Sequence, residues 1–430
     1  MRKALRIGVA GLGTVGIGVV RLLRAQASLL EARAGIGLEI VAVSARDKGR
    51  DRGADLSGMA WHDDPVALAE SDDIDVFIEL IGGSEGPARL AVEAALKAGK
   101  PVVTANKALV AHHGMALAKA AGDAGVALAY EAAVAGGIPV IKAIREGLVG
   151  NRLSSVQGIL NGTCNYILTT MRDTGRAFDD VLGEAQQLGY AEADPGFDVD
   201  GVDAAHKLAI LASLAFGSVI DFDSVYIEGI RAIGPDDMAY AEEFGLRIKL
   251  LGIAEDTPEG VIQRVHPVMI PETAPLAAVE GVFNAVVTEG DFVGTSVLEG
   301  RGAGEGPTAS AVVADIVDIA CGRARHAFGV PVDRLVKRPS LPISRHVGAY
   351  YLRLVVFDRP GVMADITAAL RDNGVSLENV IQRGHDPEAP VTVVLTMHET
   401  DEASLLSALE RIGELDSVVE KPHMIRIEGA

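Results

Sequence analysis

Residues 5–23 read LRIGVAGLGTVGIGVVRLL, and they decide how the first part of the chain folds. An apolar run of strand type leads into a glycine-rich turn, and an apolar segment of helix type follows. In such a turn Gly11 permits the sharp reversal, Gly13 lets the backbone approach a pyrophosphate, and Gly16 allows close packing of the helix. A purely structural turn is the alternative. The pattern predicts that a dinucleotide binds over Gly11, Leu12, Gly13, Thr14, Val15 and Gly16.

The first third of the chain continues this alternation of strands and helices. Strand-type runs at 38–44, 73–81 and 101–105 are separated by helices that we predict over 14–31, 87–98 and 106–122. Repeated strand–helix–strand units form parallel sheets with helices on both faces. We therefore predict an α/β fold that begins with a Rossmann-type doubly wound parallel sheet, an NAD(P)-binding domain over residues 1–135.

The choice of cofactor depends on the end of the second strand, where Arg46 and Asp47 follow VAVS. An arginine can hold the 2′-phosphate of NADP, whereas an acid accepts hydrogen bonds from the ribose hydroxyls of NAD. Both charges are also compatible with a solvated loop. The sequence favours NADP, with NAD as the alternative.

The rest of the chain has a different pattern of strand-type and helix-type runs. Residues 136–304 mix β-type runs with helices expected over 161–173, 178–188 and 201–216, which indicates an α+β substrate-binding, catalytic and dimerisation domain. An apolar helix is expected over 308–321, and the proline-containing segment 323–348 is typical of a linker. The tail, 349–428, has the order βαββαβ of a ferredoxin-like unit.

Composition excludes several classes of partner. The formal net charge of -20 disfavours nucleic acid and anionic membranes. The longest uncharged stretch near the middle, 208–220, is too short to span a bilayer, which takes about 20 residues. Cys164 and Cys321 stand far apart, so we expect no disulfide framework and a cytoplasmic location. His112 and His113 are adjacent on one helix and point in different directions, so they do not predict a metal site.

The most informative stretch is LGYAEADPGFDVDGVDAAHKLAILASLAFG, residues 188–217. Asp203 and Lys207 are four residues apart at the start of an otherwise apolar helix, a spacing that often marks only a surface ion pair. Because the residues after Lys207 are of the buried type, this lysine is predicted at the border between solvent and core, where an acid–base group can operate. A second stretch, GGSEG at 82–86, matches a hydrolase nucleophile motif, but the further motifs of that class are not apparent, and a glycine turn near the nicotinamide is the simpler interpretation.

With these motifs in order, the chain resembles the homoserine dehydrogenase family with a C-terminal ACT domain. The resemblance rests on GLGTVG, ELIGG at 79–83, TANK at 104–107, YEAAVAGGIP at 130–139, LNGTCNYI at 160–167, the GYAEADPGFDVDGVDAAHK block and GRGAGEGPTAS at 300–310. It implies reversible hydride transfer between NAD(P)H and L-aspartate 4-semialdehyde, which gives L-homoserine for threonine and methionine biosynthesis.

The resemblance also implies roles for individual residues. Lys207 matches the acid–base lysine, with Lys107 as its rival for the proton transfer, and Asp203 matches a catalytic carboxylate. The substrate-binding residues that it implies are Glu192, Asp198, Asp203 and Lys107. The cofactor-binding residues that it adds are Lys107, Gly189 and Gly304, and a helix near 305–322 is expected to return to the nucleotide domain. A sodium ion is implied at Glu131, Val134, Gly136 and Ile138.

For the tail, the resemblance implies feedback regulation. Threonine is the expected effector, and its expected contacts are Asp358, Gly361 and Val362; assembly alone is the alternative role of this unit. A homodimer or homotetramer is expected. Two other functions stay open at this point: a dehydrogenase of another amino or hydroxy acid, and a non-catalytic dinucleotide sensor, which would have no need of Lys207.

Overall fold

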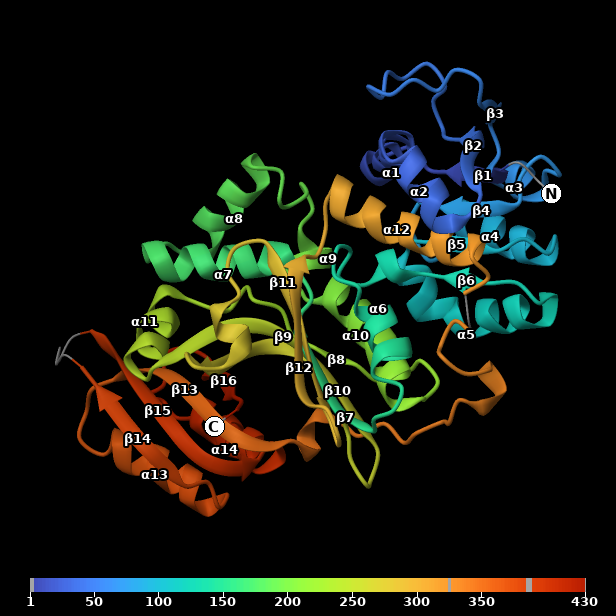
Figure 1. The fold of residues 1–430 in the computed structure, drawn as a ribbon. Helices are drawn as coiled ribbons and strands as arrows, with labels where there is room; N and C mark the ends of the chain where they lie inside the picture. The colour runs from blue at the N-terminus through green and yellow to red at the C-terminus, as the bar shows by residue number, and fades with distance from the viewer. Residues whose placement is uncertain (1–3, 324–325, 384–388, 430) are drawn as a thin grey trace.

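The computed structural model describes residues 4–323, 326–383 and 389–429, so residues 324 and 325 of the predicted linker lie outside the described part. Two sheets organise the molecule (Figure 1), one of six strands near the N-terminus and one of ten strands that extends to the C-terminal region. We call the six-stranded sheet and its helices the N-terminal unit, the elements from α6 (Val140–Lys142) to β12 (Gly294–Arg301) the central unit, and the elements from β13 (Val347–Phe357) to β16 (His423–Ile427) the C-terminal unit.

The N-terminal unit is built on a parallel sheet with the order β3-β2-β1-β4-β5-β6. Every neighbouring pair in it is parallel, and the order reverses at β1, as it does in Rossmann folds. The predicted doubly wound fold is confirmed. The strands are β1 Ala4–Ala10, β2 Gly37–Ser44, β3 Ala60–His62, β4 Val76–Glu79, β5 Val102–Thr104 and β6 Leu128–Ala129.

Helices cover this sheet, and one of them arrives from far along the chain. The prediction of a single helix over 14–31 is wrong, because Gln26 leaves helical geometry (φ -112°, ψ 18°) and separates α1 from α2. α12 packs against α1, and Arg21 of α1 pairs with Glu305 of α12 at 2.7 Å. The helices are α1 Thr14–Ala25, α2 Ala27–Ala34, α3 Pro65–Glu70, α4 Pro87–Lys97, α5 Lys107–Ala124 and α12 Glu305–Ala320.

The central unit supplies six strands of the second sheet, with its helices packed around them. Its strands are β7 Leu153–Ile159, β8 Tyr226–Ile227, β9 Leu246–Asp256, β10 Val261–Pro271, β11 Phe283–Gly290 and β12 Gly294–Arg301. Its helices are α6 Val140–Lys142, α7 Gly162–Thr174, α8 Phe178–Gln187, α9 Gly196–Val199, α10 Val202–Phe216 and α11 Pro235–Glu243. β12 lies at the end of the sheet, and one edge of the strand pairs with no other strand in the described part of the chain.

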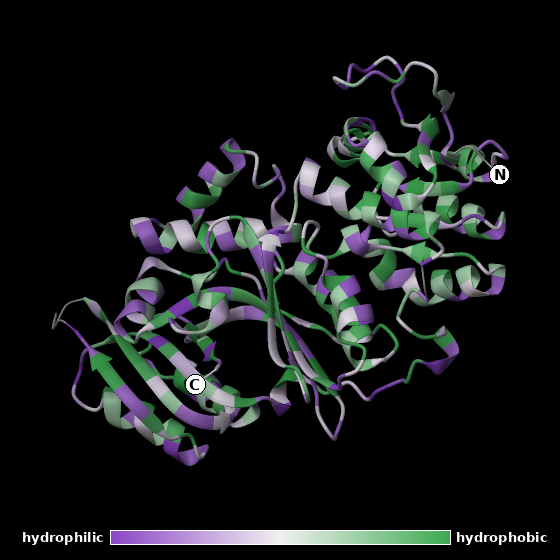
Figure 2. Ribbon diagram, viewed as in Figure 1, coloured by the Kyte–Doolittle hydropathy of each residue, from purple (hydrophilic) through white to green (hydrophobic). Residues whose placement is uncertain are grey.

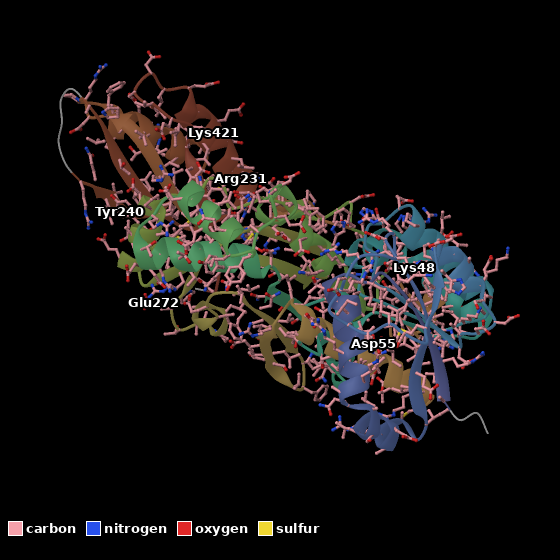
Figure 3. The ribbon with its side chains drawn as sticks, turned by 90° about the horizontal axis from the view of Figure 1, so that it is seen from above. Lys48, Asp55, Arg231, Tyr240, Glu272 and Lys421 are labelled. Carbon is pink, nitrogen blue, oxygen red and sulfur yellow. The ribbon has the colours of Figure 1, made fainter. Side chains whose placement is uncertain are left out.

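The C-terminal unit has the predicted βαββαβ order. Its elements are β13 Val347–Phe357, α13 Val362–Asp372, β14 Leu377–Gln382, β15 Pro390–Asp401, α14 Glu402–Gly413 and β16 His423–Ile427. The sheet does not stop at the boundary of this unit, because β16 pairs in parallel with β10, with Val268 opposite Arg426. The strand pattern of the sequence did not predict this connection. Figure 3 shows the extended result, with Lys48 and Asp55 at one end of the molecule and Lys421 at the other.

The segment between the central and C-terminal units is also attached to the central unit. Val336 forms a bridge with Ser218, and Ser340 forms one with Val261. Short 3-10 turns at Val332–Arg334 and Ile343–Arg345 lie on either side of these bridges. The predicted linker is therefore held in place where it crosses the central unit.

α10 is the helix that positions the predicted catalytic lysine. Every residue from Asp203 to Leu214 is buried, since the helix packs against α5 of the N-terminal unit and against β7 and β9. A helix that is apolar on all sides is expected in such a place. Figure 2 shows the same concentration of hydrophobic residues in the interior of the units. Among the described residues, no helix has the length and apolar character that crossing a bilayer requires.

Candidate active site

The glycine turn of the N-terminal unit fits a pyrophosphate. Gly11 has φ 98°, and a Cβ on it would lie 2.3 Å from the Leu80 carbonyl oxygen. A Cβ on Gly16 would lie 2.0 Å from the Gly11 carbonyl oxygen. Gly13, by contrast, has no heavy atom within 4 Å of an added Cβ, and Thr14 beside it is exposed. Backbone atoms of the protein therefore lie close to Gly11 and Gly16, whereas the space beside Gly13 at the start of α1 is free. The helix dipole favours an anion at this place.

The end of β2 lies beside this turn, since the Gly11 amide donates to the Ser44 carbonyl at 2.9 Å. Arg46 and Asp47 are exposed there, and the Asp47 carboxylate accepts a hydrogen bond from the Gly49 amide at 2.8 Å. The same loop carries three further cations, to which the sequence motifs assign no role. They are Lys48, Arg50 and Arg52. The loop is therefore richer in positive charge than Arg46 alone suggested.

The ELIGG and TANK motifs meet at the carboxyl ends of β4 and β5. The buried Glu79 carboxylate accepts from the Ile81 amide at 2.7 Å and from the Gly82 amide at 3.0 Å, and the Thr104 hydroxyl donates to its other oxygen. Asn106 caps α5 by accepting from the Leu109 amide, and it donates to the Gly83 carbonyl at 2.7 Å. These contacts fix the glycine turn at 82–86 and place Lys107 at the first position of α5.

The turn at 82–86 gives no support to the hydrolase alternative. Ser84 is half-buried, and no histidine contacts it among the described contacts. His113 instead lies 2.5 Å from the Glu85 carboxylate. A serine nucleophile needs a base within hydrogen-bond reach.

Lys207 and Lys107 converge on one carboxylate, that of Asp203. The Lys207 Nζ donates to Asp203 Oδ2 at 2.7 Å and to the Leu160 carbonyl at 2.7 Å. The Lys107 Nζ lies 3.0 Å from Asp203 Oδ1 and 5.3 Å from the centre of the Phe197 ring. The Lys107 side chain is 34% exposed and that of Lys207 only 11%. The structure thus brings a lysine of the N-terminal unit and a lysine of the central unit together through Asp203.

The electrostatics of this cluster keep Asp203 ionised. Burial of the carboxyl group raises its pKa, but the Lys207 and Lys107 ammonium groups oppose this effect, and the net pKa of Asp203 lies well below its usual range. The pKa of Asp198 is raised, first by burial and then by the neighbouring Asp203 charge. Asp203 is therefore a fixed anion between two cations, and Asp198 is a second carboxyl group close to it.

Asn161 joins the two carboxyl groups, a role that the sequence motifs do not predict. Its Nδ2 donates to Asp198 Oδ1 and to Asp203 Oδ2, at 2.8 Å each. Its Oδ1 accepts from the Cys164 amide at 2.8 Å, which caps α7. LNGTCNYI was recognised as a motif, but the sequence separation of 42 residues between Asn161 and Asp203 hid their contact.

Other predicted site residues lie outside this cluster. Glu192 is exposed on the loop between α8 and α9, and its carbonyl accepts a hydrogen bond from Gln186 at 3.0 Å. Gly189 ends the turn after α8 with φ 77°. Gly304 caps α12 with φ 118°. Among the described residues, no hydrogen bond or ion pair connects Glu192 with Lys207, and its role in substrate binding stays a prediction.

The residues predicted to hold sodium form a tight turn before α6. The Glu131 carboxylate accepts from the Ile141 and Lys142 amides at 2.9 Å each, so it caps the helix that follows. Burial and the neighbouring Asp315 carboxylate raise the pKa of Glu131 to about 7. Lys142 contacts Asp315 at 3.3 Å. The turn places two buried carboxyl groups close to one ammonium group.

This turn also contacts the glycine-rich segment at 300–304. The Gly137 amide donates to the Arg301 carbonyl at 3.0 Å, and a Cβ on Gly136 would lie 2.6 Å from the Gly302 carbonyl oxygen. Gly136 itself has φ 20°. The glycines at 136–137 and 300–304 therefore permit two backbone segments, far apart in sequence, to lie in contact.

The residues predicted to contact an effector lie where β13 runs into α13. Gly361 caps α13 with φ 99°, and Val362 is buried as the first residue of the helix. Asp358 is half-buried in the same turn. The first amides of a helix have no partner within the helix and therefore suit a carboxylate, although the Val362 amide of this 11-residue helix already donates to the Arg359 carbonyl at 3.2 Å.

His206 and Cys164 are both buried among the residues around the cluster. His206 lies with its Nε2 3.0 Å from that of His112 and stacks on Phe222 with the ring centres 4.3 Å apart. Cys164 is buried, and burial raises the pKa of its thiol well above the usual value. Within the described ranges no three His, Cys, Asp or Glu side chains form a group suited to a metal ion.

Comparisons with known proteins agree on one family. The family model "Homoserine dehydrogenase, NAD binding domain" matches residues 11–131, "Homoserine dehydrogenase" matches 139–317, and "ACT domain" matches 350–417. The homoserine dehydrogenase of Pseudomonas aeruginosa is 45% identical over 437 residues, which cover 99% of each chain.

Solved structures give the same result. The crystal structure of a homoserine dehydrogenase from Thiobacillus denitrificans has a TM-score of 0.93 and 47% identity, and the match covers 99% of this chain and 98% of that one. A hyperthermophilic archaeal homoserine dehydrogenase in complex with NADPH has a TM-score of 0.65 and 24% identity over 75% of this chain and 99% of its own. The second likeness shows the fold alone.

Proposed function

The chain belongs to the homoserine dehydrogenase family of NAD(P)-dependent oxidoreductases, and from this premise we propose how its residues divide the reaction between them. The family interconverts L-aspartate 4-semialdehyde and L-homoserine. The observation that carries the proposal is the chain of ion pairs Lys107–Asp203–Lys207, formed between the first residue of α5 and the first turns of α10. It is the place where the N-terminal and central units supply charged groups to a common site.

In this proposal Lys207 is the proton donor. An ammonium group has three N–H donors, and Lys207 uses one on Asp203 and one on the Leu160 carbonyl. The third can be directed at the aldehyde oxygen, where negative charge develops during reduction. When bound, the reduced nicotinamide supplies the hydride that adds to the aldehyde carbon. Lys207 then gives its proton to the oxygen, and its hydrogen bond to Asp203 holds the ammonium group in position beforehand.

Lys107 is the rival donor, and the two lysines differ in their surroundings. Lys107 is more exposed and has Asp203 and the Phe197 ring as its described partners. We assign it to binding of the substrate carboxylate and to the contact with the cofactor, since it stands beside the glycine turn at 82–86. Asp203, Asp198 and Glu192 are assigned to the substrate ammonium group, because a buried cation needs carboxylate partners.

We propose NADP as the preferred cofactor. The glycine turn fits the pyrophosphate, and the loop after β2 offers Arg46 with Lys48, Arg50 and Arg52 for a 2′-phosphate. The archaeal relative bound to NADPH has the same fold. Gly189 and Gly304 are assigned to the nicotinamide side, and α12 completes the N-terminal unit, giving domains over 1–135, 136–304 and 349–428 with a connecting segment at 323–348.

A sodium ion is part of the proposal through the carbonyl groups of the turn at 131–138. The Glu131 carboxylate is occupied by two amides, so the donor set that remains is the backbone oxygens of Glu131, Val134, Gly136 and Ile138. A cation there would favour the ionised forms of Glu131 and Asp315, whose pKa values are both raised by burial. NaCl should therefore raise the melting temperature more than choline chloride at the same ionic strength and pH 8. Equal effects of the two salts would remove sodium from the proposal.

The C-terminal unit is assigned to regulation by threonine. The turn with Asp358, Gly361 and Val362 offers an acid for the ammonium group and helix amides for the carboxylate of an amino acid. For the assembled protein we propose a homodimer or homotetramer. Its basis is the open edge of β12, where Val297 is 44% exposed, and the adjoining turn, where Phe292 is 88% exposed. The two free thiols are compatible with a cytoplasmic location.

One set of assays tests the assignment. The purified protein should reduce NADP, and NAD more slowly, in the presence of L-homoserine, and threonine should inhibit it. Lys207→Ala should lose about 100- to 10,000-fold in kcat while NADP still binds, because only the acid is removed. Lys107→Ala serves as the comparison and should chiefly raise KM. The reverse pattern would transfer the donor role to Lys107, and absence of turnover with either cofactor would overturn the proposed function.

A further inference from the structure

Asn161 is bonded at every polar position of its side chain. Both N–H groups of the amide are used, one on Asp198 and one on Asp203, and the amide oxygen accepts from the Cys164 backbone. The residue is only 5% exposed. The reverse orientation of the amide would direct its oxygen at two carboxylates, so the contacts fix the side chain in one way.

The partners of Asn161 are unusual for a helix cap. A cap needs only the oxygen, which accepts from an amide of the first turn. Here the nitrogen also connects two acids from different elements, Asp198 of α9 and Asp203 of α10. The Asp203 oxygen that it contacts is the one that Lys207 contacts. Leu160, the residue before it, supplies the carbonyl that holds the Lys207 ammonium group.

We propose that Asn161 is a positioning residue that holds the Asp198 and Asp203 carboxylates side by side for the ammonium group of the substrate. The inference rests on the proposed function and deepens it. Two carboxylates that accept hydrogen bonds from the same amide nitrogen lie close enough to repel each other. In the absence of substrate, the shared amide offsets this repulsion. The end of β7 thereby controls both the carboxylate pair and, through Leu160, the lysine that donates the proton.

Three substitutions separate this role from simple capping of α7. Serine and aspartate are good capping residues and alanine is not. Serine is too short to reach two carboxylates at once, and aspartate replaces the two donors by a third negative charge. If Asn161 only caps the helix, Asn161→Ser and Asn161→Asp should behave like the wild type and Asn161→Ala should be the worst.

The positioning role predicts a different order in kinetics. KM for homoserine should rise about tenfold or more in Asn161→Ser and Asn161→Ala alike, and further in Asn161→Asp, while the dissociation constant of NADP stays unchanged. The acidic limb of the pH profile of kcat/KM should move to higher pH in the serine variant, because the pKa of Asp198 loses an opposing hydrogen bond. Normal KM values in Asn161→Ser and Asn161→Asp would overturn the inference.

A second readout does not depend on activity. Asn161→Asp should destabilise the protein more at pH 8 than at pH 5, since the added buried carboxyl group must be charged at pH 8. A pure capping role gives the opposite sign, because a helix N-terminus favours the charged form. Asp401→Ala, which removes the cap of α14 far from the site, is the matched control and should show a normal KM. If the wild type failed to oxidise homoserine yet this pH trend appeared, the proposed function would fail while the carboxylate geometry stood.

Discussion

The central unit meets its two neighbours through junctions of different kinds. Toward the N-terminal unit the contacts are between separate side chains, such as Lys107 with Asp203 and His112 with His206. Toward the C-terminal unit the β-sheet itself is continuous, because β10 and β16 pair as neighbouring strands. We call these the N-terminal junction and the C-terminal junction.

The charged groups at the two junctions differ in the same way. Arg426 is 1% exposed and forms two hydrogen bonds with Glu402, at 2.8 and 2.6 Å, and one with Glu228 of the central unit at 3.1 Å. Arg264, fully buried, reaches Glu428 at 2.8 Å. At the N-terminal junction, by contrast, Lys107 is one-third exposed. The comparison teaches that the Arg426 charge at the C-terminal junction is enclosed between the units, whereas the Lys107–Asp203 pair at the N-terminal junction keeps one ammonium group accessible, as the proposed role in ligand binding requires.

The largest effect on stability is expected at the C-terminal junction. Arg426→Met leaves Glu402 and Glu228 without their buried cation and should cost about 3–5 kcal/mol of unfolding free energy. Chemical denaturation measures it, and kcat at low temperature should change little. Arg345→Met removes an exposed pair with Glu259 and should cost less than about 1 kcal/mol. Equal costs for the two variants would contradict the difference between buried and exposed charge.

The next effect is expected at the N-terminal junction and should appear in catalysis. Asp203→Asn keeps the shape of the side chain but leaves the Lys107 and Lys207 ammonium groups facing each other without an anion between them. We expect kcat/KM for homoserine to fall about 100- to 1,000-fold, with binding of NADP retained. Steady-state kinetics and cofactor titration check both parts. A loss of stability as large as that of Arg426→Met, with near-normal kcat/KM, would contradict the functional reading of this junction.

A smaller effect is expected from Glu131, beside the same junction. Burial and Asp315 raise the pKa of this acid from an ordinary 4.5 to about 7. The folded state then holds a proton that the unfolded state has released, so stability falls as pH rises from about 4.5 to 7. In sodium-free buffer, Glu131→Gln should gain about 2 kcal/mol relative to the wild type between pH 5 and 7.5. Glu146→Gln, at an exposed site, is the matched control.

Several features of the fold could be predicted from the sequence because they depend on local pattern. The glycine turn between β1 and α1, the parallel sheet and the βαββαβ order of the C-terminal unit follow from periodicity and turn residues. The pairing of β10 with β16 does not, since the choice of edge depends on how two finished units meet. The break at Gln26 was also missed, because no glycine or proline marks it.

The site residues also divide into those that local sequence pattern predicts and those that only the folded chain brings together. Lys207 and Asp203 were found because a four-residue spacing on one helix is visible in the sequence. Lys107 required the family resemblance, and Asn161 was missed, since its contacts join residues that only the folded chain brings together. An asparagine at the start of a predicted helix is only a weak signal of a site residue. Helix capping by the side-chain oxygen is enough to account for it, and the sequence does not show what the side-chain nitrogen contacts.

The smallest effect concerns His206 at the N-terminal junction. Burial, followed by the nearby His112, lowers its pKa to about 4. The unfolded chain takes up a proton near pH 6.5, so the wild type loses stability as pH falls from about 6.5 to 4. His206→Phe keeps the stack on Phe222 without a titrating group, so it should gain about 1 kcal/mol relative to the wild type between pH 7 and 5.5. Urea midpoints at the two pH values measure this, with the partly exposed His113→Phe as the control. If the stability difference between His206→Phe and the wild type were the same at both pH values, His206 would be protonated as readily in the folded state as in the unfolded chain. Its contact at the N-terminal junction would then be accessible to solvent, unlike the buried Arg426 at the C-terminal junction.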